Sequence, residues 1–371
     1  MLEIGEMMKN KKSEDQNIHS AKPEKNKSAP KVKDTTRDQL KKKELKPAKE
    51  KKSEKLSKPK KITRGKSSAL HPWYDLSNAE VAATGTDMLQ VCYEFFDQLI
   101  QDFPQYVSRQ VLGYEETGLE IREYWIQPRL IGKMRIASED INHRPTLLMI
   151  SGQHGQEYTS IINLMLMLHD LFYQTKQHPT LSLLHATYHL RIIPCLNPWG
   201  VANENRRNAR NVDLNRNFSV GWQQAQGNKG EVALSEIESR ILLDWVKRHK
   251  SETTCLLNLH DHSDLAVSWG AASHEMTQKI LLHAFQHFSV WYQQHFNDPN
   301  PEIPLTWLGI PRAGYSDKHI AEVLQVPTLL FECPYIGHAR ISEQWRDVRQ
   351  VSQQILRLIL ERLLNRYYNQ S

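Results

Sequence analysis

Residues 1–66 contain no Phe, Trp or Tyr, although the 371-residue chain has nine Phe, nine Trp and 13 Tyr. The same segment holds 22 Lys and Arg against 10 Asp and Glu. A highly charged stretch with few large apolar side chains and no aromatic ones cannot bury enough surface to fold. We therefore predict a disordered, Lys-rich tail over residues 1–66 and one folded domain over residues 67–371.

Long apolar runs and paired cysteines are also missing. The longest apolar stretch, Ile161–Leu168, is interrupted by Asn163 and is far shorter than the ~20 residues of a membrane span. The first residues include no apolar core of a secretory signal. The four cysteines, Cys92, Cys195, Cys255 and Cys333, have apolar neighbours and no paired spacing. We expect buried free thiols and a cytoplasmic protein without a transmembrane segment.

The remaining residues alternate between strand-like and helix-like patterns. This alternation predicts an α/β fold in which a mixed, largely parallel sheet carries helices on both faces. We expect strands at 107–111, 119–126, 133–138, 147–150, 188–194, 254–259 and 328–331, and helices at 87–102, 158–172, 235–247, 275–296 and 343–367. Ser235 and Glu238 would cap the helix that begins there.

Three side chains with metal-binding chemistry follow two of these strands. His154 and Glu157 stand three apart where the strand at 147–150 turns into a helix, and His260 follows the strand at 254–259. Open α/β sheets place their ligands at strand ends. Zn²⁺ takes imidazole nitrogen and carboxylate oxygen, and catalytic sites supply three such ligands. The His-x-x-Glu spacing alone would favour a solvated loop pair, but His260 as a third ligand favours a site for one zinc ion.

Further motifs occur in a set order between and after these ligands. They are Asn197-Pro-Trp-Gly200, Arg206, Asp213-Leu-Asn215-Arg216-Asn217, Ser235-Glu-Ile-Glu238 and the late strand that ends in Glu332. In this order the chain, over roughly residues 74–367, resembles the zinc carboxypeptidase (funnelin) family. The compact pattern from Arg206 to Phe218 is similar to that of short bacterial-type members, which include murein-peptide amidases.

The resemblance and the chemistry assign two catalytic roles. Zinc polarises a carbonyl and lowers the pKa of bound water toward ~7, so a nearby carboxylate must carry the proton. Glu332 is the candidate, and an Arg-paired structural Glu is the alternative. The tetrahedral intermediate needs a cation at its oxygen. Arg206 matches the family's oxyanion Arg, and its neighbour Arg207 is the competing choice.

Three more residues match the family pattern, two of them as substrate-binding residues. A C-terminal carboxylate favours the planar fork of Arg, and Asn215 with Arg216 resembles that clamp. Asp213 resembles the acid that holds the ring N–H of the first ligand His. A turn-forming Asp is the alternative for Asp213.

The chain departs from the family pattern in places. Gln156 stands where an Arg often precedes the ligand Glu. The substrate-capping Tyr of the family would fall near Ile310, and the nearest aromatic residues are Tyr315 and Trp307. His262 lies two residues after His260, on the same strand face, so it could line the substrate pocket, compete as ligand or simply pack.

Specificity rests on one acidic residue. Counted back from Glu332, Asp317 falls where family members vary the residue that reads the C-terminal side chain. An Asp there favours a cationic Lys, Arg or diaminopimelate side chain.

We therefore expect a zinc metallocarboxypeptidase or amidase that acts on a peptide or murein peptide with a free C-terminal carboxylate. One alternative is an N-acyl amino acid deacylase of the aspartoacylase and succinylglutamate desuccinylase group, which uses the same ligand set. Another is an inactive binding protein on this fold. The basic tail is either a solvated linker or a weak tether to an anionic polymer or membrane surface.

Overall fold

The computed structural model describes residues 87–129, 144–262, 267–296, 305–309, 311–334 and 353–365. Residues 1–66 and the strand predicted at 133–138 lie outside these ranges, as do residues 343–352 and 366–367 of the helix predicted at 343–367. The elements are α3 (Met88–Asp102), β1 (Val107–Tyr114), β2 (Glu120–Ile126), β3 (Thr146–Ile150), α4 (Tyr158–Tyr173), α5 (Pro179–Thr187), β4 (His189–Ile193), α6 (Pro198–Ala202), η3 (Leu214–Arg216), η4 (Trp222–Gln224), α7 (Ile237–His249), β5 (Thr253–His262), β6 (Val267–Ala271), α8 (Glu275–Phe296), β7 (Leu305–Gly309), α9 (Ser316–Val323) and β8 (Thr328–Pro334). Residues 353–365 are also helical.

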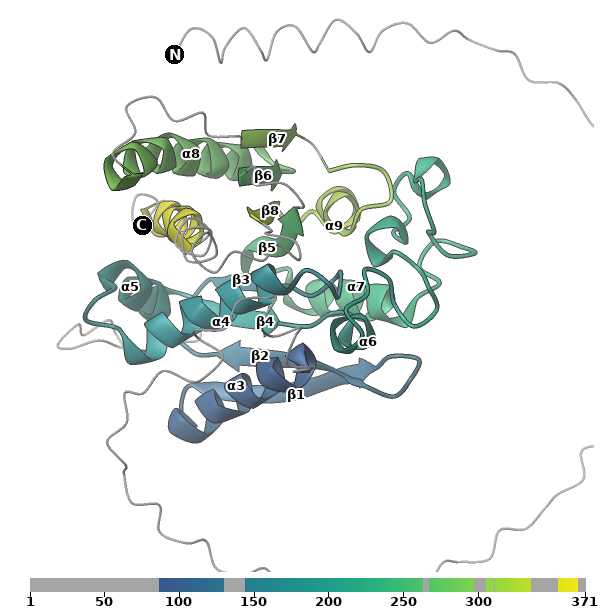
Figure 1. The fold of residues 1–371 in the computed structure, drawn as a ribbon, viewed down its shortest axis with the longest axis horizontal. Coiled ribbons are helices and arrows are strands. Elements are labelled where there is room, and N and C mark those ends of the chain that lie inside the picture. Colours follow the sequence, from purple (N-terminus) through teal and green to yellow (C-terminus); the bar gives the residue numbers. More distant parts are fainter. Residues whose placement is uncertain are drawn as a thin grey trace, which may run out of the picture. The chain divides into compact units, whose positions relative to one another are not determined.

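Six strands form the main sheet in the order β1-β2-β4-β3-β5-β8 (Figure 1). The pairs β1–β2 and β2–β4 are antiparallel, whereas β4, β3, β5 and β8 run parallel. The predicted mixed, largely parallel sheet is confirmed. Because the parallel strands share one direction, their carboxyl ends meet at one edge of the sheet, where α/β folds build their sites.

Helices cover both faces of this sheet, as predicted. Along β3, Leu147 and Met149 point into one apolar cluster, and Leu148 and Ile150 point into another. The first cluster also contains buried residues of α3, α4, α8 and residues 353–365, and the second contains those of α7 and α9. The central strand is therefore buried on both sides, which explains its uninterrupted apolar run.

Local signals set several element boundaries. Asp87 caps α3 by accepting a hydrogen bond from the Leu89 N–H at 2.9 Å. The capping prediction for Ser235 and Glu238 is wrong. The helix begins two residues later, at Ile237, and its first turn has no side-chain cap. The hydroxyl of Ser235 donates to Glu236 instead, and Glu238 accepts from Asn208.

The sequence patterns also missed structure. A second sheet pairs β6 with β7 in parallel, and neither strand was predicted. Strands β5 and β8 continue beyond their apolar runs, to His262 and Pro334.

All four cysteines are buried and free, as expected. No helix within the described ranges has the length and apolar character needed to cross a membrane.

Candidate metal centre and substrate site

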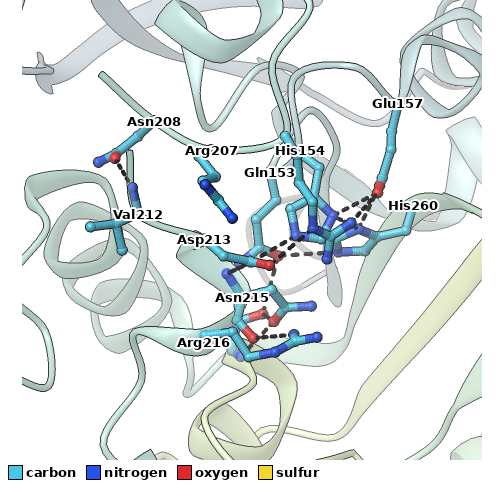
Figure 2. A network of polar contacts seen from close by, with 12 residues as sticks. Gln153, His154, Glu157, Arg207, Asn208, Val212, Asp213, Asn215, Arg216 and His260 are labelled. Carbon is cyan, nitrogen blue, oxygen red and sulfur yellow. Dashed lines mark hydrogen bonds and ion pairs between the residues drawn. The ribbon is translucent and has the colours of Figure 1, made fainter. Parts of the chain in front are cut away.

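The fold brings His154, Glu157 and His260 together at the carboxyl edge of the parallel strands. One ligand atom from each lies within 4.8 Å of the other two, and all three residues are buried. Nδ1 of His154 is 2.6 Å from Glu157 Oε1, and Nδ1 of His260 is 2.8 Å from Glu157 Oε2. Figure 2 shows the three side chains pointing toward one another.

Glycines shape the loop that carries the first two of these residues. Gly152 has a φ of +59°, a conformation that favours glycine. A Cβ on Gly155 would lie 1.8 Å from the carbonyl carbon of Gly200, so the two backbones touch. Gly200 in turn donates its N–H to the Asn197 side chain at 2.9 Å. The Asn-Pro-Trp-Gly turn thus supports the loop behind His154.

Asp213 holds the other side of the His154 ring. Its Oδ1 lies 3.0 Å from His154 Nε2, and its Oδ2 accepts from Arg206 Nε at 3.0 Å. Because the Asp213 carboxylate accepts a hydrogen bond from Nε2, the ring proton stays on Nε2. The lone pair of Nδ1 then faces Glu157. Burial lowers the pKa of His154, but the charge of Glu157 and the hydrogen bond with Asp213 raise it by more.

The three central groups fit a zinc ion. Burial raises the pKa of Glu157, and the charges of His154 and His260 lower it by more, so that the net shift is downward. The ionised carboxylate and two inward-facing Nδ1 atoms form the donor set that Zn²⁺ accepts in catalytic sites. Cation binding would also compensate a carboxylate that is otherwise buried between two rings.

Glu332 lies beside this cluster on the neighbouring strand. It is paired in register with His260 across β5 and β8. Burial raises its pKa to about 8, with a smaller contribution from the charge of Glu157, while His260 and Arg206 oppose the shift. Among the described residues, no cation forms an ion pair with Glu332, so the alternative of an Arg-paired structural Glu has no partner there.

The side chains of Arg206 and Arg207 contact different groups, Arg206 at the candidate metal centre and Arg207 at the surface. In addition to its contact with Asp213, Arg206 places Nη1 3.3 Å from Glu157 Oε1. Arg207 is exposed and donates to Asn211 at 2.9 Å. The structure therefore brings Arg206, and not Arg207, to the candidate metal centre.

Asn215 and Arg216 follow Asp213 in the short helix η3. The Arg216 guanidinium lies 4.6 Å from the centre of the Tyr315 ring and donates to the Asn215 carbonyl at 2.9 Å. Asn215 Oδ1 accepts from the Ser316 N–H at 3.0 Å. Tyr315 thus stacks on the candidate clamp. Ile310 and the side chain of Trp307 lie outside the described residues.

Asp317 and His262 complete the predicted set. Asp317 is buried in the first turn of α9 and accepts from Asn258 Nδ2 at 2.9 Å. Burial raises its pKa. Strand pairing places the backbone of His262 opposite Pro334, and its side chain lies outside the described residues.

Sequence reasoning missed several polar residues under the site. Asp261 accepts from the Thr159 N–H at 2.7 Å, where α4 begins, and donates its own N–H to Glu157 Oε2 at 3.1 Å. It thereby ties the start of α4 to β5. Gln153 lies behind His260, with Oε1 3.1 Å from the ring Nε2. The sequence did carry a signal for both residues, because Gln153 directly precedes His154 and Asp261 directly follows His260.

The chain is similar in sequence to known enzymes. A zinc carboxypeptidase of Simulium vittatum is 25% identical over 196 residues, which cover 47% of this chain and 60% of that protein. Murein peptide amidase A of Escherichia coli is 26% identical over 205 residues, covering 54% of this chain and 76% of the relative. The match to the first relative thus leaves two fifths of its length uncovered.

Solved structures support the fold. Thrombin-activatable fibrinolysis inhibitor superposes with a TM-score of 0.59 at 14% identity, over 78% of this chain and 77% of that one. A carboxypeptidase A from Helicoverpa armigera superposes with a TM-score of 0.54 at 16% identity, over 79% and 75%. The family profile described as zinc carboxypeptidase matches residues 92–303, more than half of the chain. The chain therefore belongs to the zinc carboxypeptidase family.

Proposed function

We propose that this chain is a zinc-dependent metallocarboxypeptidase or peptide amidase that hydrolyses the bond to a residue with a free C-terminal carboxylate. The observation that carries the proposal is the convergence of His154, Glu157 and His260, with Glu332 beside them on the adjacent strand. Family membership supports a hydrolase that uses zinc. We assign one zinc ion per chain to the three residues.

When bound there, zinc would supply Lewis-acid polarisation of the scissile carbonyl and make a water molecule more acidic. Glu332 would take the proton of the attacking water on a carboxylate oxygen and pass it to the leaving nitrogen. Burial and the charge of Glu157 raise the pKa of Glu332 to about 8. A cation at Glu157 would lower it and favour the proton-accepting form.

Arg206 would stabilise the negative charge that develops on the former carbonyl oxygen. Its Nε and Nη1 atoms engage Asp213 and Glu157, which hold the guanidinium in place before substrate arrives. Among the described residues, its Nη2 atom makes no hydrogen bond. A donor that is already oriented stabilises the transition state without a cost of reorganisation.

Arg216 and Asn215 would bind the terminal carboxylate of the substrate. Stacking on Tyr315 and the bond to the Asn215 carbonyl hold the guanidinium plane of Arg216. A planar fork can form two parallel hydrogen bonds with a carboxylate. Tyr315 is our candidate for the aromatic residue that covers the substrate in place of the family's Tyr near Ile310.

A peptide or murein peptide is the proposed substrate, in line with the similarity to a murein peptide amidase. Asp317 remains our candidate for reading a cationic side chain. Its Oδ1 atom is buried and has no hydrogen-bond partner among the described residues, so one acceptor is available. His262 remains a candidate for the pocket wall.

The test is metal analysis followed by a substrate screen. We expect near-stoichiometric zinc in the purified protein and release of the terminal residue from peptides or murein peptides. His260→Ala should lose the zinc, whereas Glu332→Gln should keep it and lose turnover, because Gln cannot carry the proton. His287→Ala, which removes an exposed histidine of α8, is the matched control.

Other outcomes would redirect the assignment. Turnover of N-acyl amino acids alone would indicate a deacylase of the aspartoacylase type. Bound zinc without any turnover in the screen would indicate a binding protein on this fold. Zinc retained at full occupancy in His260→Ala would remove the assigned ligand set and make His262 the next candidate.

We further propose a cytoplasmic location, with residues 1–66 as a disordered tail and residues 67–371 as the catalytic domain. The 22 basic residues of the tail would attract phosphate-bearing polymers or membrane surfaces without sequence preference. Its ten acidic residues would keep this attraction weak.

A further inference from the structure

Gln153, a fully buried amide, lies between the candidate metal centre and the candidate carboxylate clamp. Its Oε1 atom has three polar neighbours. They are His260 Nε2 at 3.1 Å, Ser316 Oγ at 3.3 Å and Asn258 Nδ2 at 3.4 Å. Figure 2 shows Gln153 beside His154 and His260, with Asn215 on its far side.

The hydrogen-bond chemistry of this network sets the orientation of the Gln153 amide. Asn258 Nδ2 donates to the Asp317 carboxylate at 2.9 Å, so the amide nitrogen of Asn258, and not its amide oxygen, faces Asp317. That nitrogen also faces Gln153, which must present its oxygen. An oxygen acceptor opposite His260 Nε2 keeps the proton on Nε2, and the Nδ1 lone pair faces Glu157 and the metal centre.

Ser316 extends the network to the clamp. Its hydroxyl lies 3.3 Å from Gln153 Oε1 and also 3.3 Å from Asn215 Oδ1. Its N–H donates to the same Asn215 oxygen at 3.0 Å. The ring of His260 and the side chain of Asn215 are thus joined through two buried residues.

We propose that Gln153 is a positioning residue that orients the His260 ring for metal binding and connects it, through Ser316, to Asn215. This inference rests on the proposed function. Asp213 performs the equivalent task for His154, so each histidine has its own acceptor behind the ring. The two acceptors differ in charge, because the acceptor behind His154 is the Asp213 carboxylate and the one behind His260 is the neutral Gln153 amide.

The test measures zinc affinity by competition with a chelator. Gln153→Leu removes the acceptor at similar volume, and we expect a loss of roughly 10- to 100-fold, the range for partners of metal-binding histidines. Gln153→Glu restores an acceptor and should stay within a few-fold of wild type. Gln353→Leu removes another buried amide, which donates to the Asn163 carbonyl on α4, and should leave zinc affinity unchanged.

Ser316→Ala separates the two halves of the inference. It leaves the acceptor behind His260, so zinc affinity should hold, while KM should rise for substrates with a free carboxylate and not for amidated ones. An unchanged KM in Ser316→Ala would refute the proposed connection from Gln153 through Ser316 to Asn215.

Unchanged zinc affinity in Gln153→Leu would overturn the positioning role while leaving the proposed function intact. A wild-type protein that binds no zinc would instead overturn the proposed function. If Gln153→Leu does not fold, as judged by circular dichroism, Gln153→Asn withdraws the oxygen by one methylene and must show the same loss.

Discussion

Glu238 should make the stability of this protein fall between pH 5 and pH 8. The side chain is 1% exposed at the start of α7, where Asn208 Nδ2 lies 3.2 Å and 3.3 Å from its two oxygens. Burial raises its pKa from 4.5 to about 7, and the neighbouring carboxylates of Glu236 and Glu115 add to the shift. The nearby cations are Arg210, 3.7 Å from Glu236, and Arg240, which lines the same hollow as Glu238.

The direction and size of the effect follow from proton linkage. A carboxyl group with a raised pKa binds its proton more tightly in the folded state. Its contribution is fully present below the unfolded pKa of 4.5 and is lost as pH rises through 7. One pKa unit corresponds to about 1.4 kcal/mol, and the shift from 4.5 to about 7 makes the loss between pH 5 and pH 8 about 2–3 kcal/mol.

Glu238→Gln tests this because the amide stays neutral at every pH. Urea denaturation at pH 5 and pH 8 should show that the free energy of unfolding of the variant rises, relative to wild type, by about 2–3 kcal/mol from the lower pH to the higher. Both proteins share the metal ligands, so the pH dependence of zinc binding cancels in the difference. Glu361→Gln, an exposed control on the helix at 353–365, should show no such gain. An equal difference at both pH values would refute the reasoning.

Three further predictions concern the clamp, the loop and the tail. Arg216→Lys keeps the charge but loses the fork, so KM for free-carboxylate substrates should rise roughly tenfold, while equal losses on amidated substrates would show that Arg216 is structural. Gly155→Ala forces a Cβ to within 1.8 Å of the Gly200 backbone, so thermal unfolding should show a loss of about 1–3 kcal/mol, and wild-type stability would contradict the close contact. Deletion of residues 1–66 should leave turnover of small substrates intact and abolish any salt-sensitive binding to nucleic acid or anionic vesicles, whereas lost turnover would move the domain boundary.

The sequence by itself determined much of the fold and the identity of the candidate site residues. The central strand β3 appears as an uninterrupted apolar run, because a strand covered on both faces has no polar side. His154, Glu157 and His260 follow the apolar parts of β3 and β5, so their convergence could be predicted from the common direction of the strands. Helix α8 was predicted with the bounds that the structure has, Glu275–Phe296.

Short and polar elements escaped this reasoning. Strands β6 and β7 each include a Gly and a Ser or Thr, so neither forms the short apolar run that identified β3, which is equally long. The expected cap at Ser235 failed because Asn217 Nδ2, 2.9 Å away, and Glu236 engage its hydroxyl. Asn217 is distant in the sequence and Glu236 is adjacent to Ser235. A capping motif in the sequence does not tell which of the possible partners the hydroxyl will bond to.

Only the tertiary structure decided between neighbours in the sequence. Arg206 and Arg207 are equally basic, and it is the contacts with Asp213 and Glu157 that bring Arg206 to the centre. The position of Gln153 behind His260 joins residues 107 apart in the chain. A hydrogen bond depends on distances of a few tenths of an ångström between side chains, and these are set by packing of the whole domain, not by spacing along the chain.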